Sequence, residues 1–156
     1  MTHSARILSA AAFVLCAAGI APLVTAAHAQ ATPAATAATA ATAKPAPEIY
    51  FHAPHDGDTV STTLTVSFGL RNYGVAPAGV KMSNTGHFHV LIDAEAPAPG
   101  VVVPADAKHI HYGMGQIEAT ITLTPGTHTL RLVLADHEHR VISRDLVSKP
   151  IRVTAR

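Results

Sequence analysis

Apolar and polar residues alternate with a period of two through most of the second half of the chain. Every second residue is apolar in 64–70 and 117–123, and shorter stretches of the same kind occur at 130–134 and 151–153. Successive side chains of a strand point to opposite faces, so this pattern indicates strands with one buried and one solvent-facing side. Asp, Pro and Gly cluster between these stretches, as they do in turns. We therefore predict an all-β fold, an immunoglobulin-like antiparallel β-sandwich of about seven strands.

The first 47 residues have a different composition. Residues 1–29 combine an early arginine, a long apolar stretch and small residues around 27–29, which predicts a signal peptide. A retained membrane anchor is the alternative, because the apolar stretch approaches spanning length, although glycine and proline interrupt it. Residues 30–47 hold only Ala, Thr, Pro, Gln and Lys, which predicts a disordered linker. We expect a periplasmic or secreted protein with its β-sandwich domain in 48–156 and no membrane span after signal cleavage.

Charge and cysteine content exclude several classes of function. The chain has 11 Lys and Arg against 10 Asp and Glu, so it lacks the basic surface that a nucleic-acid partner requires. The one cysteine, Cys16, falls in the predicted signal peptide, which excludes disulfides and thiolate metal sites in the processed protein. Histidine is the abundant residue, with 11 in 156 positions, about three times its usual share.

Six of these histidines form three His-x-His pairs. Nine histidines follow residue 29, and random placement would give about 0.6 pairs at this spacing. On a strand, residues i and i+2 point to the same face, so each pair presents two imidazoles side by side. Imidazole-rich sites without thiolates suit Cu(II) and Zn(II). The sequence therefore predicts a divalent-metal site whose candidate ligands are His87, His89, His109, His111, His137 and His139.

The alternation also predicts how exposed individual histidines are. Apolar residues separate and follow the first pair, which places His87 and His89 on the opposite, accessible face of their strand. In contrast, His128 is in phase with Leu130, so we expect a partly buried histidine with satisfied hydrogen bonds and not a ligand. The three pairs converge on one site only if their strands are neighbours, and the sequence leaves this open.

Several short stretches occur in a characteristic order along residues 48–156. They are 74–80, 84–93, 104–106, 109–113, 115–118, 125–130 and 136–139. Together they resemble the bacterial domain-of-unknown-function family 4399, a family of small exported proteins. The resemblance implies an exported domain without an assigned biochemical function. Members typically carry a further histidine where this chain has Phe88, and a His-Pro-rich run where it has 141–144.

Two other functions are compatible with the sequence. A metal-free interaction module with an envelope protein as its partner would suit an immunoglobulin-like sandwich, although a fold alone does not decide function. A cupin-like metalloenzyme is the other. The pair His87 and His89, followed by Asp93 or Glu95 and then by His128, is similar to the two-histidine, one-carboxylate set of non-haem iron enzymes. No nucleophile elbow supports a hydrolase. The sequence favours a binding protein over an enzyme.

Overall fold

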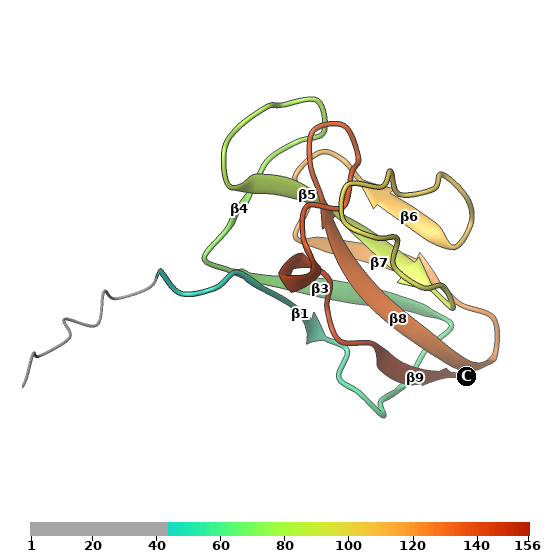
Figure 1. Cartoon of the computed structure of the whole chain (residues 1–156). Helices are drawn as coiled ribbons and strands as arrows, with labels where there is room; N and C mark the ends of the chain where they lie inside the picture. Colours follow the sequence, from blue (N-terminus) through green and yellow to red (C-terminus); the bar gives the residue numbers. More distant parts are fainter. Residues whose placement is uncertain (1–43) are drawn as a thin grey trace, which may run out of the picture. The chain divides into compact units, whose positions relative to one another are not determined.

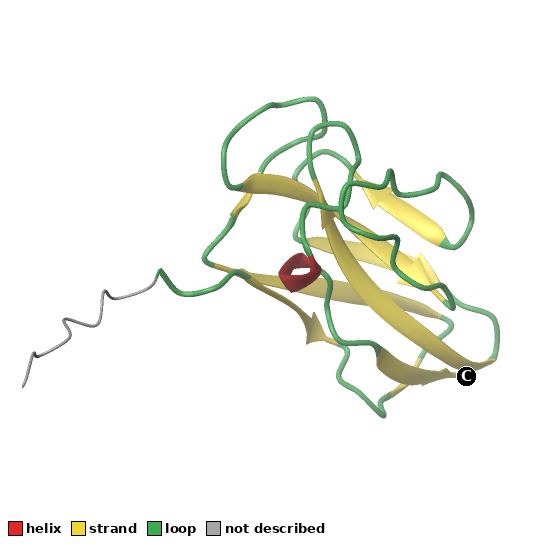
Figure 2. Cartoon of the chain, in the orientation of Figure 1, coloured by secondary structure: helices red, strands yellow, loops and turns green. Residues whose placement is uncertain are grey.

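The computed structural model describes residues 44–156, so the predicted signal peptide and most of the predicted linker lie outside the described residues. Strands dominate the described part (Figures 1 and 2). They are β1 (Glu48–Ala53), β2 (Thr59–Val60), β3 (Thr63–Arg71), β4 (Gly74–Val75), β5 (Thr85–Ile92), β6 (His109–Tyr112), β7 (Glu118–Thr122), β8 (Gly126–Ala135) and β9 (Ile151–Ala155), with one short 3-10 helix, η1 (Arg144–Leu146). Among the described residues, no helix is long and apolar enough to cross a membrane.

The strands form two sheets. The smaller sheet has the order β1-β3-β7, and the larger one has the order β2-β9-β8-β5-β4, with β6 also paired to β5. All pairs are antiparallel except the two-residue strands β2 and β4, which pair in parallel with β9 and β5. The prediction of an all-β, immunoglobulin-like sandwich of about seven strands is confirmed, since the other seven strands have four or more residues.

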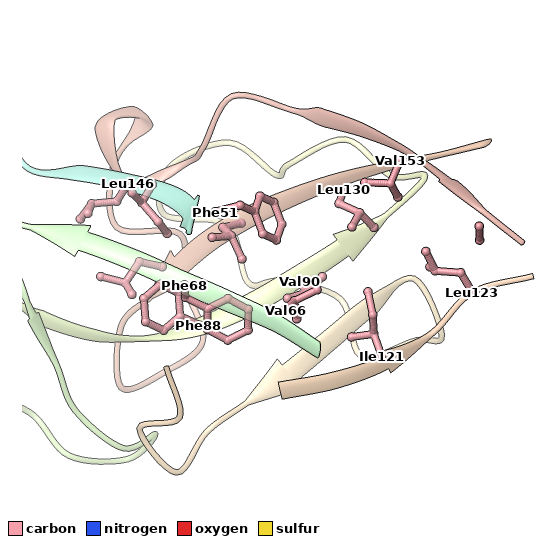
Figure 3. Close-up of a cluster of buried hydrophobic side chains, with 14 residues drawn as sticks. Phe51, Val66, Phe68, Phe88, Val90, Ile121, Leu123, Leu130, Leu146 and Val153 are labelled. Carbon is pink, nitrogen blue, oxygen red and sulfur yellow. The ribbon is translucent and has the colours of Figure 1, made fainter. Parts of the chain in front are cut away.

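The main core lies between the two sheets (Figure 3). Phe68 of β3 and Phe88 of β5 meet across the gap with ring centroids 4.9 Å apart. Val66 and Leu132 are fully buried in the same cluster. Burial of each large apolar side chain contributes about 1.5–3 kcal/mol, and this fixes which face of β5 points inward. Residues 88 and 90 of β5 face the core, so residues 87, 89 and 91 face outward.

The outward face of β5 and β8 is also covered, which the sequence did not predict. A second buried cluster contains Leu91, Val103, Val133, Ala135 and Val141. The covering residues come from the long loops after β5 and β8, which are tied together by backbone hydrogen bonds between residues 100–101 and 141. His87 and His89 share this face and are 0% and 2% exposed. The expectation that these two imidazoles are accessible is therefore wrong.

Candidate metal centre

Strand pairing brings three histidines together on the covered face of the larger sheet. His87 and His89 lie two residues apart on β5 and point to the same side. In the antiparallel pairing of β5 with β6, His111 lies directly opposite His89. On the other edge of β5, His87 lies opposite Ala135, the last residue of β8. The chain that follows β8 therefore starts beside His87, and it carries a fourth histidine.

His139 reaches the cluster from a tight turn after β8. Asp136 closes this turn: its Oδ1 accepts hydrogen bonds from the backbone N–H groups of Glu138 and Arg140, both at 2.9 Å. Its own backbone pairs with Arg140 and His139. His139 has a φ of 65°, in the left-handed region that is uncommon for non-glycine residues. The backbone oxygen of His139 also accepts a hydrogen bond from Val103 at 2.8 Å.

The four imidazoles form one compact cluster. The ring centroids of His87, His89, His111 and His139 lie between 4.8 and 6.0 Å apart in all six pairings. The Nε2 atoms of His87 and His89 are 3.1 Å apart. Two nitrogens bound to one Zn²⁺ at 2.0–2.1 Å lie about 2.8–3.4 Å apart when they are not opposite each other. The buried pair already has the spacing of two ligands of one metal.

The third strand histidine completes a possible ligand set. One ring nitrogen from each of His87, His89 and His111 lies within 4.8 Å of the others. Opposite ligands of one metal are about 4 Å apart, so a small inward rotation of a ring closes the set. His111 is the exposed member of the three.

Burial and mutual proximity keep His87 and His89 uncharged near neutral pH. Burial is the largest cause that lowers the pKa of His87 to about 4 and of His89 to about 3, and the neighbouring imidazoles lower both further. The pKa of His111 is lowered for the same two reasons. Asp136 acts in the opposite direction and raises the pKa of His87, as the smallest of the four causes. Neutral imidazole is the form that binds metal ions.

The two buried imidazoles are poorly satisfied as a purely structural pair. One Nε2 atom can donate to the other, but the Nδ1 atoms of both His87 and His89 are buried without a hydrogen-bond partner among the described residues. A buried polar atom left unpaired costs about 1–3 kcal/mol. An apolar pair of similar size would be more stable at this position. Ring nitrogens of His87, His89 and His111 lie close enough together that they could hold a metal ion.

Gly113 gives the His111 ring the space that it occupies. A Cβ atom at this glycine would overlap the Cε1 and Nε2 atoms of His111 and would lie 3.2 Å from the Cβ atom of Ala78. The neighbouring loop is held against this point, because the Ala78 N–H donates to the Gly113 carbonyl at 2.8 Å. The sequence offered no separate signal for this role, since the glycine follows the strand as any turn residue would.

Replacing Gly113 by alanine is expected to weaken Cu(II) binding by about tenfold or more, as loss of an outer-shell residue typically does. The added methyl group displaces the His111 ring from the other three. Isothermal calorimetry of the Gly113→Ala variant measures this loss. In a His111→Ala background the same change should have no further effect, and a further loss there would contradict the steric explanation.

Two of the six predicted ligands lie outside the cluster. His109 is on the same strand as His111, but its Nδ1 atom donates to Asp106 Oδ1 at 2.8 Å. His137 precedes His139 by two residues in the turn, where the same-face rule of extended strands does not hold. Its carbonyl oxygen accepts a hydrogen bond from Gly79 at 3.1 Å. Each of these two pairs therefore contributes one imidazole to the cluster, while the first pair contributes two.

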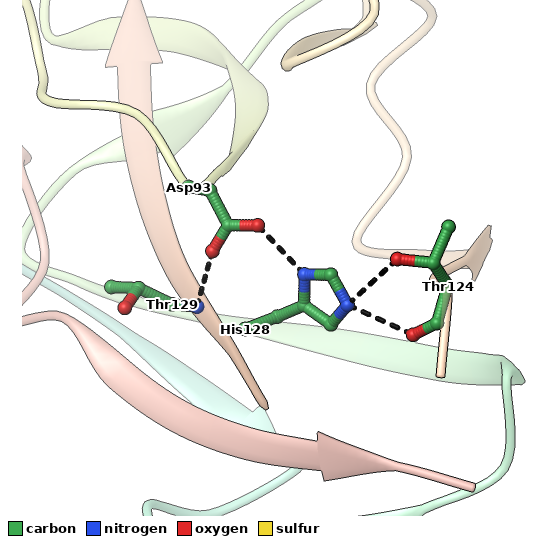
Figure 4. A network of polar contacts seen from close by, with 4 residues as sticks. All are labelled: Asp93, Thr124, His128 and Thr129. Atoms are coloured by element: carbon green, nitrogen blue, oxygen red, sulfur yellow. Dashed lines mark hydrogen bonds and ion pairs between the residues drawn. The ribbon is translucent and has the colours of Figure 1, made fainter. Parts of the chain in front are cut away.

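His128 is a satisfied structural histidine, as the sequence predicted (Figure 4). Its Nδ1 atom donates to Asp93 Oδ2 at 2.7 Å, and in the protonated imidazole its Nε2 atom also donates to the carbonyl oxygen of Thr124 at 2.9 Å. The hydrogen bond to Asp93 raises the pKa of His128. Asp93 also accepts a hydrogen bond from the Thr129 N–H at 2.8 Å. These partners tie the loop after β5 to the start of β8.

The carboxylates considered as ligands of an iron enzyme form hydrogen bonds or ion pairs with other side chains and backbone groups. Asp93 binds His128 and Thr129, and Glu95 forms an ion pair with Arg131. The structure therefore places no carboxylate of this set with the histidine cluster, and the three histidines proposed for a cupin-like triad do not share one pocket.

The fold and the site define a β-sandwich domain with four imidazoles gathered under the loops at one end. The family described as a domain of unknown function (DUF4399) matches residues 66–156. The chain belongs to this family, which confirms the resemblance seen in the sequence. Comparison with curated proteins gives no match.

One solved structure is similar to this chain. It is described as "Structures of Clostridium thermocellum CbhA fibronectin(III)-like modules". The two sequences are 12% identical, the match covers 69% of this chain and 95% of the other, and the TM-score is 0.34.

Proposed function

We propose that this protein binds a divalent transition metal, Cu(II) or Zn(II), through His87, His89, His111 and His139, and that it acts as a periplasmic or secreted protein. The observation that carries the proposal is the convergence of four imidazoles within 6.0 Å. The 3.1 Å separation of the Nε2 atoms of His87 and His89 supports it, because two ligands of one Zn²⁺ lie about 2.8–3.4 Å apart. The predicted signal peptide supports export.

The donor set favours copper among the common divalent metals. It consists of imidazole nitrogen atoms, and residues 44–156 contain no cysteine to supply a thiolate. Imidazole suits Cu(II), Zn(II) and Ni(II), and the affinity of a given site normally rises to a maximum at Cu(II). Zn(II) would be held by the same ligands in a tetrahedral arrangement.

Titration of the untagged protein with Cu(II) and with Zn(II) by isothermal calorimetry tests the proposal. We expect one ion per chain, with binding that weakens as the pH falls and protons compete for the imidazoles. Binding no tighter than about millimolar near neutral pH would overturn the proposal, because such affinity is only about −4 kcal/mol.

Each His-x-His pair that has only one member in the cluster provides a matched control. Loss of a ligand in His111→Ala or His139→Ala is expected to weaken Cu(II) binding by about 100-fold, the upper end of what outer-shell changes cause. His109→Ala and His137→Ala remove an imidazole two residues away and should stay within about threefold of the wild type. Calorimetry under one condition compares all four variants. Equal losses in both members of a pair would indicate nonspecific binding to surface histidines.

A metal-free interaction module is the second candidate, favoured by exposed apolar side chains on the loops. The exposed large apolar residues of the described chain are Val80, Met82, Val101, Val102, Met114 and Ile117. A protein partner could cover such a surface. The two candidates differ in a simple observation: a ligand that binds the folded state raises the melting temperature, whereas a metal-free module melts at the same temperature with and without Zn(II).

A further inference from the structure

We propose that Asp136 is a positioning residue of the metal centre: it holds the turn after β8 in the shape that directs the His139 imidazole at the three strand histidines. This inference rests on the proposed function. It adds a residue outside the ligand set and assigns the fourth coordination position to the turn.

The four ligands are held by two different kinds of backbone. His87, His89 and His111 sit on the paired strands β5 and β6, and the hydrogen-bond ladder between these strands fixes their spacing. His139 is not part of a strand: it lies in a turn and has a φ of 65°. A non-glycine residue keeps this conformation only where its surroundings enforce it. The position of the fourth imidazole therefore depends on whatever holds the turn.

Asp136 supplies the side-chain contacts inside the turn. Its Oδ1 atom accepts hydrogen bonds from the N–H groups of Glu138 and Arg140, one on each side of His139, at 2.9 Å each. Its carbonyl oxygen accepts the His139 N–H at 2.9 Å, and its N–H donates to the Arg140 carbonyl at 2.9 Å. An aspartate that bonds the backbone two and four residues ahead organises a turn in this manner. Loss of the Oδ1 acceptor leaves two backbone donors without that partner.

The outer side of the turn is anchored independently of Asp136. The carbonyl oxygens of His137 and His139 accept hydrogen bonds from Gly79 and Val103, and the Arg140 guanidinium donates to the Gly100 carbonyl at 3.0 Å. These bonds tie the turn to the two neighbouring loops, which lie at the same end of the sandwich (Figure 1). A change at Asp136 should therefore reshape the turn locally and leave the sandwich folded.

Two conservative variants distinguish the effect of the acceptor position of Asp136 on the turn from the effect of its negative charge. Asp136→Asn keeps an oxygen acceptor at the same distance from the backbone and removes the charge. Asp136→Glu keeps the charge and moves the acceptor outward by one methylene group. Glu138→Gln is the matched control, because it removes a neighbouring exposed carboxylate that forms an ion pair with Arg140 at 3.7 Å.

Calorimetric titration with Cu(II) and electron paramagnetic resonance of the loaded proteins measure the effect. We expect Asp136→Glu to weaken binding by about 10–100-fold and to lose one nitrogen ligand from the Cu(II) spectrum. Asp136→Asn and Glu138→Gln should stay within about threefold of the wild type with an unchanged spectrum. In a His139→Ala background, Asp136→Glu should cause no further loss, because a positioning residue acts only through the group that it positions.

Three results would overturn this inference while the proposed function stands. The first is wild-type affinity and spectrum in Asp136→Glu. The second is an Asp136→Asn variant that loses as much affinity as Asp136→Glu, which would assign the effect to charge. The third is a further loss from Asp136→Glu in the His139→Ala background. Failure of the proposed function is distinct, because the wild type itself would then bind no metal. Melting temperatures of the metal-free variants verify that each is folded.

Discussion

Replacing both His87 and His89 by leucine is expected to abolish metal binding and to raise the melting temperature of the metal-free protein. The change removes the two most buried ligands of the cluster. It also removes two buried Nδ1 atoms that have no partner among the described residues, each at a cost of about 1–3 kcal/mol. Calorimetric unfolding should show a gain of several degrees, since 1 kcal/mol corresponds to about 2–8 °C in domains of this size range.

A satisfied histidine provides the control for this double replacement. Both ring nitrogens of His128 have partners, and its pKa is raised by the bond to Asp93. His128→Leu should therefore lower the melting temperature and leave metal binding intact. If the His87→Leu, His89→Leu double variant instead unfolds at a lower temperature than the wild type, the two imidazoles contribute to stability and the argument from their unpaired atoms fails.

Acidification of the metal-free protein is expected to reduce its stability between about pH 6.5 and pH 4. The pKa of His87 falls to about 4 and that of His89 to about 3 in the folded state, against about 6.5 in the unfolded chain. Within this window the unfolded chain binds more protons than the folded protein, so the free energy of unfolding decreases as the pH falls. Each unit of pKa difference corresponds to about 1.4 kcal/mol. Urea unfolding at a series of pH values measures the slope.

His111, whose pKa is also lowered, adds to the same slope, whereas the other groups with shifted pKa values act outside most of this window. His128 has a raised pKa, so its contribution is present below about pH 6.5 and is lost at higher pH. Asp93 and Asp106 have lowered pKa values, so their contributions are lost only as the pH falls through about 3.8 and below. The His87→Leu, His89→Leu double variant should flatten the slope between about pH 4 and 6.5. An equally steep slope in that variant would assign the acid sensitivity to other residues.

The alternation of apolar residues predicted the strands and their inward faces correctly, because the side chains that pack in the core between the sheets must be apolar. In β3 and β8, the residues in phase with Val66 and Leu132 are those that meet across the sandwich. The covered outer face was not predictable in the same way. Val103 and Val141 lie in loops without periodicity, and only the folded backbone shows that they pack on Val133.

The candidate ligands were identifiable from their spacing, but their grouping was not. The same-face rule correctly placed His87 beside His89, since both lie within β5. The register of β5 against β6, which sets His111 opposite His89, depends on pairing across a long loop that the sequence does not encode locally. His139 lies in a turn, where residues i and i+2 need not point to the same side. Its imidazole therefore joins the cluster while that of His137 does not.

The position of the metal in crystals of the protein grown with Zn(II) tests the central claim most directly. Anomalous scattering at the zinc absorption edge locates the ion independently of the protein atoms. The account predicts one strong peak between β5, β6 and the turn after β8, about 2.0–2.1 Å from ring nitrogens of His87, His89 and His111, with His139 as the fourth ligand. A cluster free of zinc in crystals whose only peaks lie at His109, His137 or residues elsewhere on the protein would contradict it.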